Sequence, residues 1–297
     1  MKNVCACFIG SDETAKMLGN KATVSDLEFL HYKKTDSVLT IVRPIGFPEK
    51  IKTLIQAVNM TDYVVVELSA VDKFFGEIII LLDLLGKKGC FIVPLDKQHL
   101  VEQVKSFGLD YNFRIINNND DIKQLKDDLL MIEPVYGNEP LIIIDHFFNI
   151  KNVGTVALGF TKGGTIKVKD KFVLLPGGRP AQLNSMQSMD VDYKEINWPA
   201  RVGVSLKNCD VKDLERGSIL SNELKETKEL SGEIIKSRFF KGELKKFMVI
   251  NGLLSRQAEL KDKVMLEKTI VLIGPSVIYD DNTSPRIIGI IKQKGAE

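Results

Sequence analysis

Apolar and polar residues follow different patterns in the N-terminal part of the chain and in the rest, and this difference predicts two kinds of structure. In the N-terminal part, the apolar runs that predict strands are Val4–Ile9, Val38–Val42, Tyr63–Leu68, Cys90–Val93 and Phe113–Ile116. The segments with helical periodicity between them are Glu49–Asn59, Gly76–Leu85, Lys97–Phe107 and Asp120–Met131. Apolar strands joined by amphipathic helices are typical of an α/β domain with a doubly wound parallel sheet.

Helical patterning nearly disappears after residues 133–140, a segment of turn residues that predicts a linker. Residues 141–175 alternate apolar and polar side chains around a turn at 162–164, which is typical of antiparallel strands that close into a small barrel. The charged segment 222–229 predicts a second connector, and short strands follow it. We therefore expect three domains: an α/β domain at 1–136, a β-barrel at 137–224 and a second all-β barrel at 225–297.

Composition adds limits on function. The 297 residues are 44% hydrophobic and 27% charged, as in ordinary soluble proteins, and a length of this order suggests two or three domains. A net charge of +2 gives no overall basic field, so any RNA site must be a local patch. One candidate patch, which could equally be solvated strand faces, contains Lys151, Lys162, Lys167, Lys169, Lys171 and Arg179.

Cysteine spacing and the N-terminus bear on metal binding and location. The four cysteines show no pairing or histidine spacing typical of zinc, so we predict no metal site and expect reduced thiols. The first apolar run is too short for a signal peptide or a membrane span. We therefore expect a cytoplasmic protein.

The run from Ile144 to Val156, IDHFFNIKNVGTV, resembles without a gap a segment of domain 2 of the elongation factors that deliver aminoacyl-tRNA, EF-Tu and above all SelB, where the corresponding run is IDHxFxIKGxGTV. Two further SelB-like segments, 185–187 and 214–217, follow in the same order. Residues 285–291 resemble the closing strand of domain 3, and SelB's fourth domain has no counterpart in the sequence. The resemblance implies a G-domain-like α/β domain, followed by EF-Tu-like domains 2 and 3, and a role in protein biosynthesis.

The phosphate loop of this family has the pattern GxxxxGK[ST]. Its glycines let backbone N–H groups surround the phosphates, its lysine neutralises charge and its hydroxyl binds Mg²⁺. The first strand is followed here by Gly10 and Lys16 at the correct spacing, but Ala15 replaces the second glycine and Met17 replaces the hydroxyl. Two acidic residues, at 12 and 13, would also repel a phosphate.

The other nucleotide motifs of the family are altered as well. In place of DxPGH the chain has RPIGF, which keeps Gly46 but lacks the metal carboxylate and the histidine that orients water. In place of NKxD it has VPLD, which keeps only Asp96. Phosphoryl transfer depends on a positioned metal and water. We therefore predict no catalytic residue, no Mg²⁺ site and no GTP hydrolysis. A scaffold domain, or weak binding of GTP or GDP through Gly10, Lys16, Gly46 and Asp96, stays open.

The barrel carries the candidate aminoacyl-binding residues. Asp145, His146 and Arg201 stand where the resemblance implies SelB's pocket for selenocysteine. Arginine is always charged and histidine can donate a hydrogen bond, so such a pocket favours a small anionic side chain, that of cysteine or selenocysteine. Neighbouring residues of a regular strand face opposite ways, so Asp145 and His146 reach one ligand only if the strand ends or bulges. A structural histidine and a surface ion pair are the alternatives.

These patterns predict a SelB/EF-Tu-like translation factor that binds the charged 3′ end of an aminoacyl-tRNA without hydrolysing GTP. Aminoacyl-tRNA is the implied partner, contact with the ribosome is left open, and neither DNA nor a membrane is expected. Two alternatives stay open. One is a GTP-binding elongation factor with a weak or unusual nucleotide site, and the other is an interaction module of the translation machinery that holds no tRNA.

Overall fold

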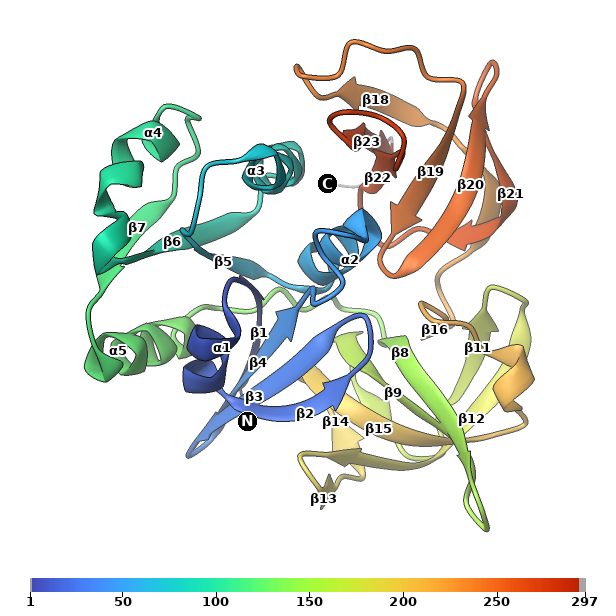
Figure 1. Ribbon diagram of the computed structural model, residues 1–297. Coiled ribbons are helices and arrows are strands. Elements are labelled where there is room, and N and C mark those ends of the chain that lie inside the picture. Colours follow the sequence, from blue (N-terminus) through green and yellow to red (C-terminus); the bar gives the residue numbers. More distant parts are fainter. Residues whose placement is uncertain (1, 294–297) are drawn as a thin grey trace.

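The first sheet of the molecule is a seven-stranded mixed sheet (Figure 1). The computed structural model describes residues 2–293. Five strands run parallel in the order β4, β1, β5, β6, β7, and β3 and β2 extend this sheet antiparallel beyond β4. In spatial order the strands are β2 (Asn20–Val24), β3 (Glu28–Lys34), β4 (Ser37–Arg43), β1 (Lys2–Ile9), β5 (Tyr63–Glu67), β6 (Lys88–Pro94) and β7 (Asn112–Ile116).

The prediction of a wholly parallel sheet is therefore wrong at one edge, because the chain turns back after β3 and pairs it antiparallel with β4. Helices cover both faces, as a doubly wound sheet requires. Cys5 and Cys7 of β1 pack in the cluster that contains α2 and α3, whereas Ala6 and Phe8 pack in the cluster that contains α1 and α5. The helical segments are α1 (Asp12–Leu18), α2 (Ile51–Met60), α3 (Lys73–Leu85), the 3₁₀ turn η1 (Leu95–Leu100), α4 (Val101–Lys105) and α5 (Asn119–Leu130).

The second sheet closes on itself, as predicted for the barrel at residues 137–224. Its strands pair in the order β11, β16, β8, β9, β15, β12, and the pairing of β11 with β12 completes the barrel. These strands are β8 (Leu141–Ile150), β9 (Gly154–Gly163), β11 (Lys171–Leu175), β12 (Arg179–Ser188), β15 (Ala200–Lys207) and β16 (Ile219–Ser221). The accessory elements are β10 (Ile166–Lys167), β13 (Val191–Asp192), β14 (Glu195–Ile196) and the 3₁₀ turn η2 (Val211–Asp213).

The third sheet is antiparallel, and its described strands do not pair into a closed ring. It starts at β17, inside the segment predicted as a connector. Its strands are β17 (Glu226–Leu230), β18 (Gly232–Lys236), β19 (Lys246–Asn251), β20 (Leu254–Leu260), β21 (Val264–Val271), β22 (Ser276–Tyr279) and β23 (Ile287–Gln293). The predicted domain boundaries after residues 136 and 224 fall in the connections between the three sheets, and the division into domains stays a prediction.

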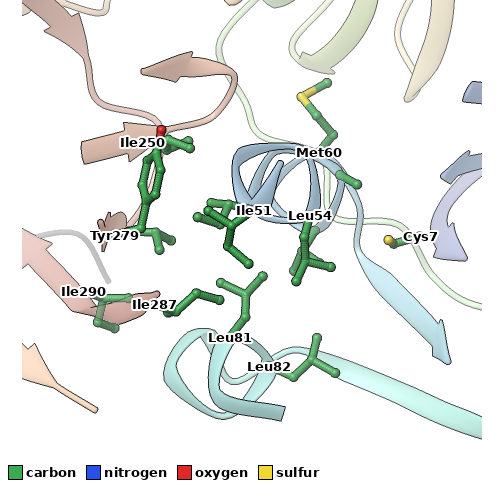
Figure 2. Close-up of a cluster of buried hydrophobic side chains, with 14 of the residues drawn as sticks. Cys7, Ile51, Leu54, Met60, Leu81, Leu82, Ile250, Tyr279, Ile287 and Ile290 are labelled. Atoms are coloured by element: carbon green, nitrogen blue, oxygen red, sulfur yellow. The ribbon is translucent and has the colours of Figure 1, made fainter. Parts of the chain in front are cut away.

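One hydrophobic core joins the first and third parts of the chain. In Figure 2, Ile51 and Leu54 of α2 and Leu81 of α3 lie beside Tyr279 and Ile287 of the third sheet, and all five side chains are buried. Polar contacts reinforce this interface. Glu77 of α3 and Arg286 form an ion pair at 2.5 Å, and the Gln56 amide donates to the Leu253 carbonyl at 2.6 Å.

Candidate functional site

The carboxyl ends of the parallel strands border a pocket of about 890 Å³. Ligands of open α/β sheets bind at this edge. Gly10 and Lys16, two of the four predicted nucleotide-binding residues, line the pocket. Gly46 and Asp96 do not. Gly46 packs against Thr53, and Asp96 is an exposed residue of η1 with an ion pair to Lys97. The structure therefore brings together only half of the predicted nucleotide residues.

A carboxylate lies against the segment that follows β1, where the sequence predicts the remains of a phosphate loop. The backbone N–H of Ser11 donates to Glu67 Oε2 at 2.6 Å, and the Thr14 hydroxyl donates to Glu67 Oε1 at 2.7 Å. A Cβ atom at Gly10 would lie 2.5 Å from the same carboxylate. Glu67 thus takes a donor that a phosphate loop would offer to its ligand, and its negative charge opposes a bound phosphate. Glu67 could not be predicted from the sequence. It is the last residue of β5, and the sequence of a buried strand does not indicate which distant segment its last side chain contacts.

Arg43, which stands where the resemblance to EF-Tu and SelB implies a metal-binding carboxylate, is also engaged within the protein. Its buried guanidinium pairs with Glu28, with Asp12 at 2.7 Å and with the Gly10 carbonyl at 3.2 Å. The hydrogen bond and charge of Arg43 lower the pKa of the Asp12 carboxyl. The guanidinium already has three partners and Lys21 pairs with Glu28 at 3.1 Å, so the pocket offers a phosphate little free positive charge besides Lys16.

In the barrel, Asp145 and Arg201 meet through a β-bulge. Ile144 of β8 pairs with Gly159 and His146 pairs with Leu158, so Asp145 is the extra residue. Both Asp145 oxygens accept hydrogen bonds from Arg201, at 2.7 and 3.0 Å. This bidentate geometry is the strongest arrangement for such a pair. The residues are only 6% and 8% exposed.

The first sheet covers this ion pair. The Thr23 hydroxyl accepts a hydrogen bond from Arg201 Nη2 at 3.0 Å, and the guanidinium carbon lies 3.8 Å from the ring centroid of Phe29. The ring of Phe29 also contacts that of Phe160, with centroids 5.7 Å apart. Burial, and secondarily the charge of Arg201, lowers the pKa of nearby His31 to about 4. In this arrangement β2 and β3 separate the Asp145–Arg201 pair from solvent.

His146 does not join the pair. Its side chain is exposed, and its ring contacts Phe148 at 5.7 Å between centroids. The bulge that would let both residues face one ligand is present, but it buries Asp145 against Arg201 and leaves His146 on the surface of the barrel. The structure therefore brings together two of the three predicted aminoacyl-binding residues and leaves the third at the edge of the buried pair.

A half-exposed apolar strip starts at His146 on the outer face of the hairpin. Cross-strand pairs share a face of a sheet, and the pairs here are His146 with Leu158 and Phe148 with Val156. Ile150, which is 40% exposed, continues the strip to the hairpin tip. We call this set of residues the outer strip. It consists of His146, Phe148, Ile150, Val156 and Leu158.

Three of the six residues of the predicted basic patch form ion pairs within the protein. The ion pairs are Lys162 with Asp62 at 3.4 Å, Lys167 with Glu195 at 3.1 Å and Arg179 with Asp213 at 3.3 Å.

The four cysteines are all buried, and burial raises the pKa of the Cys5 thiol to about 12. Residues 2–293 contain no cluster of His, Cys, Asp or Glu that could hold a metal ion. None of the helices in this range is both long and apolar enough to cross a membrane.

Comparison with known proteins gives the family. No protein-family model matches the chain. The uncharacterized protein MJ0325 of Methanocaldococcus jannaschii is 32% identical over 294 residues, which cover 93% of this chain and 94% of that protein. The chain belongs to the same family as this archaeal protein. Because the relative is itself uncharacterized, the family assignment gives no function directly.

Elongation factors are more distant relatives of this chain. The selenocysteine-specific elongation factor of the same organism is 28% identical over 225 residues, which cover 67% of this chain and 47% of that protein. Elongation factor 1-alpha of Cenarchaeum symbiosum is 30% identical over 37% of this chain and 26% of its own length. The chain thus matches about half or less of these two elongation factors. The predicted resemblance to SelB and its relatives is confirmed.

Solved structures extend the likeness to the whole fold. SelB of Methanococcus maripaludis, bound to the GTP analogue GppNHp, superposes with a TM-score of 0.80 at 20% identity over 99% of this chain and 79% of that protein. The same factor without nucleotide gives 0.78, and a bacterial selenocysteine-specific factor gives 0.80. The three parts of this chain are therefore arranged as in SelB.

Proposed function

We propose that the protein is a translation factor that binds the charged 3′ end of an aminoacyl-tRNA and does not hydrolyse GTP. The observation that carries this proposal is the outer strip, which starts at His146 beside the Asp145–Arg201 pair. The strip is formed by the segment of the sequence that most resembles SelB. Relatives named as elongation factors support a role in translation.

The outer strip suits an unpaired RNA end. Single-stranded nucleic acid binds proteins through bases that stack on aromatic side chains, and every base has a face that can stack. Phe148 is half-buried and its ring contacts that of His146, so the two offer a supported aromatic surface. Val156 and Leu158 provide an apolar floor beside it. A terminal adenosine on this strip would place its esterified amino acid near the bulge.

We assign Asp145, His146 and Arg201 to the aminoacyl group. His146 is exposed and can contact the ligand directly, whereas Thr23 and Phe29 cover Arg201. The amino acid therefore reaches the guanidinium only when β2 and β3 separate from the barrel. Arginine and histidine side chains at this site favour a small anionic side chain, such as that of cysteine or selenocysteine.

Loss of GTP hydrolysis is proposed for the first domain, which we infer to be a degenerate G domain. Its strand order and helices on both faces support this origin. The carboxylate of Glu67 already holds a backbone donor of the phosphate loop. Gly10, Lys16, Gly46 and Asp96 are accordingly vestiges of a nucleotide site, and only the first two still line the pocket.

Protection of the aminoacyl ester from hydrolysis tests the RNA-binding proposal. The half-lives of cysteinyl-tRNA and selenocysteinyl-tRNA should lengthen in the presence of excess protein. Phe148→Ala should weaken binding roughly tenfold, because a base stacked on an aromatic ring contributes about 1–3 kcal/mol. Val191→Ala, at an exposed position of β13, serves as the control from the same barrel. Equal half-lives with and without protein for every charged tRNA would exclude the function.

A second candidate is a GTP-binding elongation factor with an unusual nucleotide site. The pocket of about 890 Å³ beside Gly10 and Lys16 is the observation that favours it. Calorimetric titration with GTP and Mg²⁺ separates the two candidates. Saturable heat at micromolar concentration supports this second function, and a flat titration excludes it.

A further inference from the structure

Arg216 carries two buried donor atoms that have no protein partner among residues 2–293. Its Nε and Nη2 atoms are inaccessible to solvent and have no hydrogen-bond acceptor among the described residues. No carboxylate lies within ion-pair distance of it in the described part of the chain. Two other largely buried arginines nearby differ in this respect, since Arg201 is paired with Asp145 and Arg256 with Glu215.

An unpaired buried guanidinium is costly to the fold. Arginine does not lose its proton in proteins, so it cannot escape the cost by becoming neutral. Burial lowers the pKa of Arg216, and the nearby charges of Asp145 and Asp26 only partly oppose this. Both acids are already engaged, Asp145 with Arg201 and Asp26 with Lys50 at 2.9 Å. Groups that are buried and unsatisfied in this way are uncommon and point to a ligand or a functional role.

The position of Arg216 links it to the aminoacyl-binding residues. The backbone N–H of Gly217 donates to the Ile144 carbonyl at 2.8 Å, and the Ile144 N–H donates to the Ser218 carbonyl at 2.8 Å. Arg216 is therefore held beside the bulge that carries Asp145. Its side chain is only half-buried as a whole, so part of it reaches solvent.

We propose that Arg216 is the cation that recognises an anionic amino-acid side chain at this site, while Arg201 holds Asp145 and the barrel in place. The inference rests on the proposed function and names the group that determines specificity within it. Asp145 neutralises Arg201, so the uncompensated positive charge at the bulge belongs to Arg216. A selenolate or thiolate would supply the missing acceptor. The neutral hydroxyl of serine, whose side chain has a similar shape, would be a weaker acceptor.

One tRNA charged in turn with serine, cysteine and selenocysteine tests the proposal, because these amino acids share a shape and differ in charge. The probe is the ester half-life of each under reducing conditions. Wild-type protein should protect the selenocysteinyl ester more strongly than the seryl ester, by roughly tenfold to a hundredfold for a hydrogen bond between charged groups. Arg216→Met should bring this ratio close to one, and Arg216→Lys should keep part of it. Arg238→Met, at an exposed position, should leave it unchanged.

Urea unfolding of the same variants gives a readout that does not depend on tRNA. Arg216→Met removes an unpaired buried charge and keeps most of the aliphatic volume, so its unfolding midpoint should rise above that of the wild type. A midpoint below the wild type would show that the guanidinium is paired in solution and would overturn the inference. A selenocysteine preference that survives in Arg216→Met would overturn it too, with the proposed function intact. If the wild-type protein protects no ester at all, the proposed function fails and the inference falls with it.

Discussion

At the scale of single residues, one extra amino acid in β8 determines the geometry of the barrel site. The bulge at Asp145 turns its carboxylate inward to Arg201 and leaves His146 on the surface. The two charges are removed from water together and satisfy each other at short distance. Such a pair contributes little net stability, but the loss of one partner leaves the other charge buried alone.

The first prediction concerns this ion pair. Asp145→Asn should lower the free energy of unfolding by about 3–5 kcal/mol, because Arg201 then stays buried without a counter-ion. Glu195→Gln, which breaks a largely exposed pair with Lys167, should change it by less than about 1 kcal/mol. Urea unfolding monitored by circular dichroism measures both. Equal effects of the two substitutions would show that Asp145 and Arg201 are not desolvated.

The second prediction concerns His31 and pH. Its pKa is about 4 in the folded protein and about 6.5 in an unfolded chain. The unfolded state therefore binds more protons between these values, and stability should fall as pH drops from 6.5 towards 4. The contribution of His31 is on the order of 3 kcal/mol. His31→Gln should flatten this part of the pH profile of urea unfolding, whereas His99→Gln, at an exposed site, should not. An unchanged profile in His31→Gln would refute the assignment.

At the scale of secondary-structure elements, the β8–β9 hairpin joins the barrel core to the surface that we propose binds RNA. One face of the hairpin packs in the barrel core through Ile142, Ile144 and Ala157, and the other presents the outer strip. Close backbone packing around the bulge holds the two strands in register. A Cβ atom at Gly159 would lie 2.3 Å from the Ile143 carbonyl oxygen, whereas one at Gly203 of β15 would only touch Leu158 at 3.4 Å.

The third prediction concerns these two glycines. Gly159→Ala should destabilise the protein by about 3 kcal/mol or more, because a backbone oxygen cannot move aside as a flexible side chain can. Gly203→Ala should cost less than about 1 kcal/mol, since the contact falls within ordinary van der Waals range. The midpoints of thermal unfolding compare the two. A stable Gly159→Ala protein would mean that the strands are not paired as described.

The sequence predicted most elements but not the contacts between them. Strong apolar runs and helical periodicity identified β1, β4 and β5 and the helices α2, α3 and α5. The hairpin β2–β3 was missed, because its residues alternate weakly and one strand is mostly exposed. The resemblance to SelB predicted Asp145 and Arg201 as site residues. It gave no indication that they are buried, because Thr23, which helps to cover them, lies in a distant part of the chain. Arg216 was missed for the same reason, since an unsatisfied donor is recognised only when all of its neighbours are known.

At the scale of the whole molecule, contacts join all three parts. The first and third share a core and the Glu77–Arg286 pair, the first and second meet at Thr23 and Arg201, and the second and third meet at the ion pair of Glu215 with Arg256. The SelB structures with and without GppNHp superpose on this chain almost equally well.

A fourth prediction follows from the shared core. Residues 1–136 should unfold together with the rest of the protein in a single transition, since separation would expose the α2 and α3 faces that pack on the third sheet. Differential scanning calorimetry should give equal calorimetric and van't Hoff enthalpies. A separate early transition, or a calorimetric enthalpy well above the van't Hoff value, would show that the first domain is only loosely attached.

Ester protection with and without nucleotide tests the central claim most directly. The half-life of a charged tRNA that the protein protects is measured in three solutions: without nucleotide, with GTP and Mg²⁺, and with GDP and Mg²⁺. We predict the same protection in all three, because the outer strip is already exposed and Glu67 holds a backbone donor of the segment expected to bind a phosphate. Protection that appears only with GTP and Mg²⁺ would contradict this and would show that the pocket of the first domain still controls the barrel.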